Sequence, residues 1–160
     1  MELNKILVKN EVACLYRNKK HTENFFVGIV NMVDEDNIVF TSLSSEGEIE
    51  GLMLINSKDV YLVEKNNKYI EKIKKDSKNK ELIVFKEDNK GVKNVFYDFL
   101  SNNTNIVEVE VNNSAHVDVR GRIINYDEQW LEIQVVNEKQ EDDGIAFCRM
   151  EDITVVNALV

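Results

Sequence analysis

The chain repeats one pattern at a fixed spacing of 93 residues. The segment from Gly121 reads Gly-Arg-Ile-Ile-Asn-Tyr-Asp-Glu-Gln-Trp-Leu-Glu-Ile, and the segment from Gly28 reads Gly-Ile-Val-Asn-Met-Val-Asp-Glu-Asp-Asn-Ile-Val-Phe. The match runs without a gap over 28–64 and 121–157, and most apolar positions are apolar in both copies. Seven positions are identical, and in the first copy they are Gly28, Asp34, Glu35, Glu48, Gly51, Asp59 and Val63. A match at a constant offset predicts a duplicated structural unit.

The repeat divides the 160 residues into three parts. We expect a first repeat over 1–64, a basic helical connector over 65–91 and a second repeat with a leading helix over 92–160. Units of this size bury a limited fraction of their surface. The two copies are therefore expected to pack on each other or on other subunits.

Both repeats are acidic, and the basic side chains gather in the connector. Lys and Arg against Asp and Glu number 6 and 11 over 1–64, 9 and 5 over 65–91, and 5 and 13 over 92–160, which sum to a net charge of −9. Phosphate binding draws its affinity mainly from Lys and Arg. This distribution argues against broad nucleic-acid binding and leaves room for a local site.

Short β-branched segments separated by polar turns predict five strands in each repeat. The expected strands are 12–16, 25–33, 37–43, 51–55 and 59–63 in the first copy, and 106–111, 117–126, 129–136, 144–149 and 152–157 in the second. The predicted fold class is mainly β with helices (α+β), built as two small five-stranded barrels joined by a helical connector.

The sequence also predicts structure for segments outside these strands. An apolar stripe with helical spacing predicts a helix over 92–101, and Tyr69, Ile70 and Ile73 share one face of a helix in the connector. Residues 81–85 favour a short strand or a buried extended segment, and 2–10 fits either a short helix or an extended lead-in.

Glycine and aspartate recur at four equivalent positions. Gly28 and Gly121 lie inside predicted strands, where glycine often marks a sharp bend or a close backbone approach. Asp34 and Asp127 follow these strands and suit a turn, since Asp accepts hydrogen bonds from its own local backbone. The second landmark consists of Gly51 and Asp59 in the first copy and Gly144 and Asp152 in the second.

Together, these residues resemble the Sm-like fold, with the bacterial Hfq branch as the nearest pattern. The resemblance rests on Val92–Leu100 as the helix, Ile106–Val111 as the next strand, Gly121–Asp127 with Leu131–Ile133, and Asp152–Val156 as the last strand. The first copy repeats the glycine-to-aspartate spacing, and the two copies cover about 110 of the 160 residues. Other SH3-like barrels use a similar pattern.

The resemblance implies RNA binding on oligomeric rings, yet this chain departs from the family's binding residues. The asparagine that usually follows the motif's aspartate would fall on Ile38 and Leu131, with Asn37 and Trp130 one position earlier. The loop before the last strand reads Asn-Ser-Lys-Asp up to Asp59 and Arg-Met-Glu-Asp up to Asp152. Neither loop reproduces the lysine–histidine arrangement of Hfq.

Candidate contact residues are few. Trp130 alternates with polar residues and could stack on a base or partner, or else pack on the connector helix or the other repeat. Arg120 and Arg122 flank Gly121 and could contact phosphate, although pairing with Glu108 or Glu110 across the sheet is the favoured interpretation. The remaining candidates are Asn37 and the connector lysines Lys72 and Lys75, which a true RNA chaperone would use together with Lys74, Lys78 and Lys80.

The sequence contains no recognisable motif for catalysis or for metal binding. The sequence contains no Walker loop, Rossmann glycine motif or nucleophile elbow. His21 and His116 lack zinc spacing with Cys14 and Cys148. The cysteines lie in apolar patterns and are expected to be buried thiols of a cytoplasmic protein. We expect no catalytic residues, cofactor, metal or membrane contact.

The leading hypothesis is a non-enzymatic tandem Sm-like module for assembly or interaction, with a protein partner or self-association and weak or local RNA contact. Duplication lets two units pair edge to edge within one chain, which covers sheet edges that otherwise invite uncontrolled pairing. The alternative is an acidic inhibitor or immunity-type protein that binds a basic protein through complementary charge.

Overall fold

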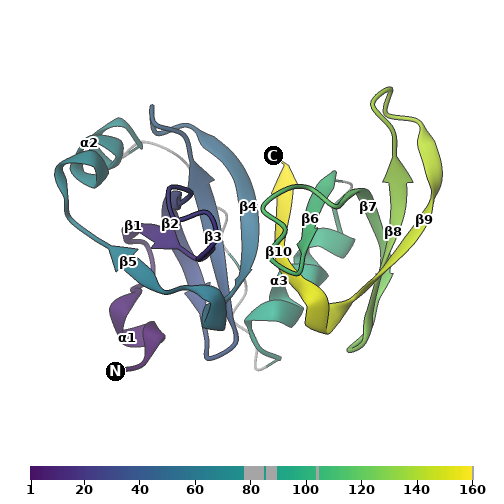
Figure 1. The fold of residues 1–160 in the computed structure, drawn as a ribbon, viewed down its shortest axis with the longest axis horizontal. Helices are drawn as coiled ribbons and strands as arrows, with labels where there is room; N and C mark the ends of the chain where they lie inside the picture. The colour runs from purple at the N-terminus through teal and green to yellow at the C-terminus, as the bar shows by residue number, and fades with distance from the viewer. Residues whose placement is uncertain (78–84, 86–89, 104, 160) are drawn as a thin grey trace.

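The computed structural model describes residues 1–77, 85, 90–103 and 105–159. Within them, ten antiparallel strands form one sheet, with few helices, so the fold is mainly β and of the α+β class (Figure 1). Segment 81–85, expected as a short strand or a buried extended segment, lies outside the described residues except for Phe85. Lys78 and Lys80 also lie outside them.

The elements follow the repeat. The first half, which we define as residues 1–64, contains α1 (Leu3–Ile6), β1 (Val12–Tyr16), β2 (Phe26–Val33), β3 (Asn37–Leu43), β4 (Ile49–Asn56), the 3-10 turn η1 (Ser57–Asp59) and β5 (Leu62–Glu64). Helix α2 (Lys68–Ser77) follows. The second half, residues 90–159, contains α3 (Val92–Ser101), β6 (Val107–Val111), β7 (Val119–Tyr126), β8 (Trp130–Val136), β9 (Asp142–Arg149), η2 (Met150–Asp152) and β10 (Ile153–Leu159).

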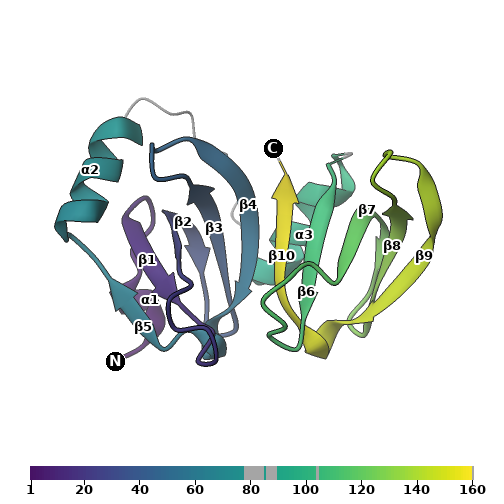
Figure 2. The same cartoon turned by 45° about the horizontal axis from the view of Figure 1, so that its top comes forward.

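The expected pair of closed barrels is wrong. The strand order is β5-β1-β2-β3-β4-β10-β6-β7-β8-β9, so each half contributes five neighbouring strands to one open sheet. Strand β4 pairs with β10 of the second half and not with β5 of its own half. For this reason the first half does not close into a barrel. Figures 1 and 2 both show β4 and β10 side by side in the middle of the molecule.

Each half nevertheless bends its strands at the same places. A Cβ on Gly28 would overlap the carbonyl oxygen of Thr41, and a Cβ on Gly121 would overlap that of Gln134, so the neighbouring strand approaches closely in both copies. The pairing register shifts shortly afterwards, between Val30 and Met32 in β2 and at the matching place in β7. Such irregularities bend a strand and raise its twist.

The predicted turn at the motif's aspartate is present in both halves. Asp34 Oδ1 accepts hydrogen bonds from the backbone N–H groups of Asp36 and Asn37 at 2.9 and 2.8 Å. Asp127 Oδ1 accepts the equivalent bonds from Gln129 and Trp130, both at 2.7 Å.

Two helices pack against different strands of the sheet. Ile70 and Ile73 of α2 are fully buried against β1, as their spacing predicts. Helix α3 lies against β3 of the first half and β7 of the second, and buries Phe96 and Tyr97. No helix in the part of the chain that the structure describes has both the length and the apolar character to cross a bilayer.

Candidate functional site

The junction between the halves is a five-pair antiparallel ladder. Strands β4 and β10 are in register as Ile55 with Val155, Leu54 with Val156, Met53 with Asn157, Leu52 with Ala158 and Gly51 with Leu159. At the end of this ladder, Asn56 Nδ2 donates to the carbonyl oxygen of Ile153 at 3.1 Å. The edge pairing that the duplication permits is therefore present within the chain.

The junction is also covered on one face. Leu52 and Leu54 belong to a core cluster that includes Phe96 of α3 and Val109 of β6, and they are 1% and 5% exposed. The backbone N–H of Val92, at the start of α3, donates to Asp34 Oδ2 at 3.0 Å. A helix of the second half thus seals the outer face of the first.

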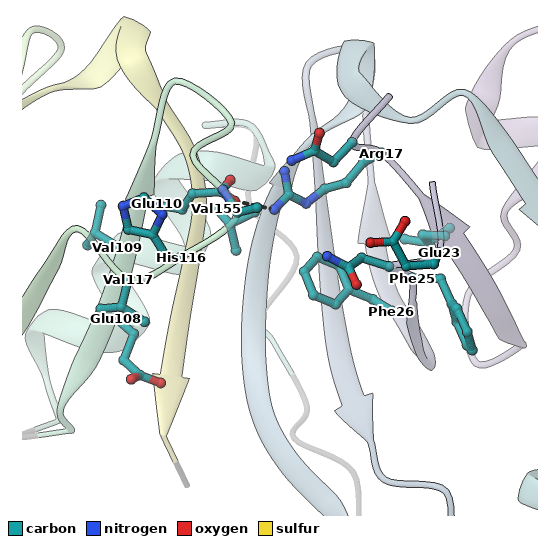
Figure 3. A pocket seen from close by; sticks show the side chains of 14 residues that line it. Arg17, Glu23, Phe25, Phe26, Glu108, Val109, Glu110, His116, Val117 and Val155 are labelled. Carbon is teal, nitrogen blue, oxygen red and sulfur yellow. Dashed lines mark hydrogen bonds and ion pairs between the residues drawn. The ribbon is translucent and has the colours of Figure 1, made fainter. Parts of the chain in front are cut away.

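A buried polar network closes the other side of the junction. Arg17 Nη2 donates to Glu110 Oε1 at 2.6 Å (Figure 3). Its Nη1 donates to Asn113 Oδ1 at 3.0 Å. Glu110 also accepts from the backbone N–H of Ala115 and from the hydroxyl of Thr154. The ion pair links the halves in a region that water hardly reaches, because both side chains are 8% exposed.

Among the residues that the structure describes, none covers the opposite edge of the second half in this way. Strand β9 is the repeat equivalent of β4, and it ends the sheet. Its outward residues Ile145 and Phe147 are 54% and 61% exposed, although they match the buried Leu52 and Leu54. Gly144 has open space where Gly51 meets Asn157 across the junction. Strand β9 therefore presents the apolar face that β4 buries.

The far edge of the first half also exposes side chains whose repeat equivalents are buried. Strand β5 is the repeat equivalent of β10 and forms the other end of the sheet. Tyr61 and Leu62 are 40% and 44% exposed, whereas their equivalents Thr154 and Val155 are buried at the junction. Both open edges therefore expose apolar side chains at positions that the internal junction covers.

The predicted contact residues do not come together. Trp130 begins β8, is half-buried, and has the Arg149 guanidinium of its own half 4.2 Å from its ring centre. Asn37 is buried at the start of β3. Lys72 and Lys75 are exposed on α2, next to the first half.

The two arginines beside Gly121 pair with different carboxylates. Arg120 lies opposite Glu108 across the sheet, with Nε 3.9 Å from Oε2, which confirms the favoured interpretation. Arg122 of β7 instead has Nη1 3.7 Å from Asp142. Asp142 belongs to the edge strand β9, which lies on the far side of β8 from β7.

Reactive groups are scarce in the described part of the chain. Cys14 and Cys148 are buried free thiols, as predicted. Burial, together with the charge of Glu64, raises the pKa of Cys14 to about 11, and burial likewise raises the pKa of Cys148. A thiol with such a pKa stays protonated and is a poor nucleophile at neutral pH. The described residues contain no cluster of three His, Cys, Asp or Glu side chains arranged for a metal ion.

Sequence reasoning missed the residues that define the junction and the edges. The local pattern places Arg17 in a polar turn and offers Glu110 only as a partner for arginine across the sheet. Nothing in the one-dimensional pattern links them. The sequence did indicate that Ile145 and Phe147 occupy positions of a buried face, because their repeat equivalents Leu52 and Leu54 are also apolar.

Comparison of this chain with protein-family models, with curated proteins and with solved structures finds no match.

Proposed function

We propose that the chain is a non-enzymatic assembly module that associates head to tail with copies of itself. The single observation that carries this proposal is the β4–β10 junction, together with the two open edges that are its repeat equivalents. The same surface pair that joins the halves is available between chains. The five strands of each half follow one another in the same order along the sheet, which supports this arrangement and fits the tandem of Sm-like units that we propose.

The repeat fixes the register of the proposed contact. Adding 93 to the β4 residues and subtracting 93 from the β10 residues turns the pair Met53–Asn157 into Ala146–Glu64. The neighbouring pairs become Phe147 with Val63 and Cys148 with Leu62. Strand β9 of one chain would then extend the sheet at β5 of the next.

The contact between chains is expected to be weaker than the internal junction. Strand β5 has 3 residues, whereas β10 has 7, so fewer ladder bonds can form. Helix α1, with 4 residues, is shorter than the 10-residue α3 that covers the internal junction. Assembly should therefore depend on concentration. A head-to-tail contact builds rings or filaments according to the rotation between neighbours.

Light scattering on a size-exclusion peak, read with absorbance at 260 and 280 nm, tests the proposal. Wild type should form multimers whose mass rises with concentration, and Phe147→Lys should shift them to monomer because it places a charge in the apolar contact. Val117→Lys, at another exposed apolar residue away from both edges, is the matched control. A wild-type protein that stays monomeric at every concentration contradicts self-assembly, and co-eluting nucleic acid would favour the RNA hypothesis.

A cysteine pair tests the register itself. Ala146→Cys with Glu64→Cys should form a disulfide between chains under oxidation, since paired strands bring Cα atoms to about 4.5–5.5 Å, within disulfide range. Ala146→Cys with Val63→Cys is the control, because neighbouring strand residues point to opposite faces. Equal cross-linking in both variants would reject this register.

A further inference from the structure

A cavity of about 460 Å³ lies at the junction, beside the Arg17–Glu110 pair. The β1–β2 segment of the first half forms one wall, and β6 with the loop after it forms the other (Figure 3). This volume lies within the range of small-molecule sites, about 300–1,000 Å³. The cavity is distinct from the β9 and β5 edges, so ligand binding there does not depend on the proposed assembly.

The cavity walls are mainly apolar. Phe25 and Phe26 come from the first half, and Val117 and Val155 from the second. The ring of Phe25 stacks on the ring of Tyr16, with ring centres 5.2 Å apart. Phe25 and Val117 nevertheless remain 40% and 47% exposed. A ligand with an aromatic or branched body would bury apolar surface that the protein leaves open.

The two terminal nitrogens of the buried arginine have protein partners, and its Nε is buried without a hydrogen-bond partner among the described residues. Both Nη groups of Arg17 donate to second-half side chains, and its guanidinium lies 5.2 Å from the ring centre of Phe26. Arg17 is the one Lys or Arg among the described residues that line the cavity. His116 also lines the cavity, and its Nε2 lies 3.1 Å from Asp118, so among the described lining residues an anionic ligand would find no Lys, Arg or His side chain without a carboxylate beside it.

Two carboxylates remain at the cavity, one on each wall. Glu23 is 3.9 Å from His21, and Glu108 is 3.9 Å from Arg120, so both ion pairs are long. Figure 3 shows the two side chains on opposite sides of the cavity. Carboxylates beside aromatic rings favour a cation, because the ring face is also electronegative.

We infer that this cavity binds a small organic cation with an aromatic or branched apolar body. Its body would lie against Phe25, Val117 and Val155, and its ammonium would point to Glu108 or Glu23. Because the walls belong to different halves, such a ligand would also stabilise the junction, by binding the folded state alone.

Titrations of the ¹⁵N-labelled full chain at pH 7.5 would test the inference. The probes are phenethylamine, its neutral counterpart 2-phenylethanol and its anionic counterpart 3-phenylpropionate. Phenethylamine should produce saturable chemical-shift changes at the β1–β2 segment and the loop after β6, with at least tenfold tighter binding than either counterpart. Equal affinity for the three probes, changes located elsewhere or no saturation would overturn the inference.

Matched variants locate the charge and the body of the ligand. Glu108→Gln should weaken phenethylamine binding about three- to fivefold, the scale of a partly exposed ion pair, and Val117→Trp should weaken it by filling the mouth. Glu138→Gln, an equal charge change on an exposed residue outside the cavity, should leave the affinity unchanged. If Glu138→Gln weakens binding as much as Glu108→Gln, net charge alone is responsible and the site is rejected. Spectra of each free variant establish that it is folded.

Discussion

The carboxylates of Asp34 and Asp127 show how one residue type organises the same turn twice. Each accepts two backbone N–H groups of the turn that follows its strand. Asp34 makes one more hydrogen bond, because its second oxygen, Oδ2, accepts the backbone N–H of Val92 at the start of α3. The duplicated residue therefore closes a local turn in both copies, and in the first copy it also ties the second half to the first.

The turn at Asp127 predicts a pH-dependent loss of stability. Hydrogen bonds from the backbone of Trp130, and then of Gln129, lower the pKa of Asp127 below its ordinary value of 3.8. A lowered folded-state pKa stabilises the protein above the unfolded-state pKa, and this contribution is lost as the pH falls through the folded-state pKa. Asp127→Ala should lower the Tm at pH 7, and the difference from wild type should shrink below about pH 4.

The matched variant is Asp127→Asn, whose side-chain oxygen still accepts the backbone bonds without a charge. It should lose less Tm than Asp127→Ala at pH 7. A Tm difference between wild type and Asp127→Ala that is constant from pH 7 to about pH 3 would contradict the assignment.

At the scale of elements, the bend of the second strand depends on a close approach of backbones. Gly28 and Gly121 both face a carbonyl oxygen of the next strand, with no room for a Cβ. The predicted role of these glycines, a bend or close approach within a strand, is confirmed. Gly144 is different, because its φ of +84° lies in the left-handed region while the space around it is open.

These two glycines predict different costs for the same substitution. Gly121→Ala should destabilise the protein by about 2–3 kcal/mol, since the methyl group can be accommodated only if β7 and β8 move apart. Gly144→Ala should cost about 1–2 kcal/mol, the penalty for an L-residue in the left-handed region. Urea unfolding measures both free energies. Equal costs would contradict the close approach as the reason for glycine at position 121.

At the scale of the whole molecule, the largest of the three core clusters among the described residues is built from both halves. The largest cluster joins Val39, Leu52 and Leu54 of the first half to Val109 and Leu131 of the second. The sheet is continuous across β4 and β10, and the buried pair of Arg17 and Glu110 crosses the same boundary. Separation of the halves would expose this cluster and leave two charges without partners.

The shared core predicts a single cooperative unfolding transition. Far-UV circular dichroism reports both halves, and Trp130 fluorescence reports the second, so both signals should change at the same urea concentration. Arg17→Leu leaves Glu110 buried without its cation and should destabilise the whole molecule by about 3 kcal/mol, with the two signals still coincident. Lys19→Leu, on the exposed turn nearby, is the control. Two separate transitions would show that the halves fold independently.

The sequence by itself determined the duplication, both longer helices, the turns at Asp34 and Asp127, and the close approaches at Gly28 and Gly121. It also determined the strands, except that the one expected over 59–63 starts only at Leu62, after the 3-10 turn Ser57–Asp59. These features depend on local periodicity and backbone geometry, which neighbouring residues encode. The sequence permitted edge-to-edge pairing of the copies without deciding whether they pair.

Only the tertiary structure decided what that pairing produces. Whether β4 pairs with β5 or with β10 depends on which edge lies closest in space, and residues far apart in the chain compete for the same ladder bonds. The pair of Arg17 and Glu110, the cavity beside it and the exposed β9 edge all result from that choice. Hydrophobic patterning places a residue on a face of a strand, but the neighbour that covers this face is set by the packing of the whole molecule.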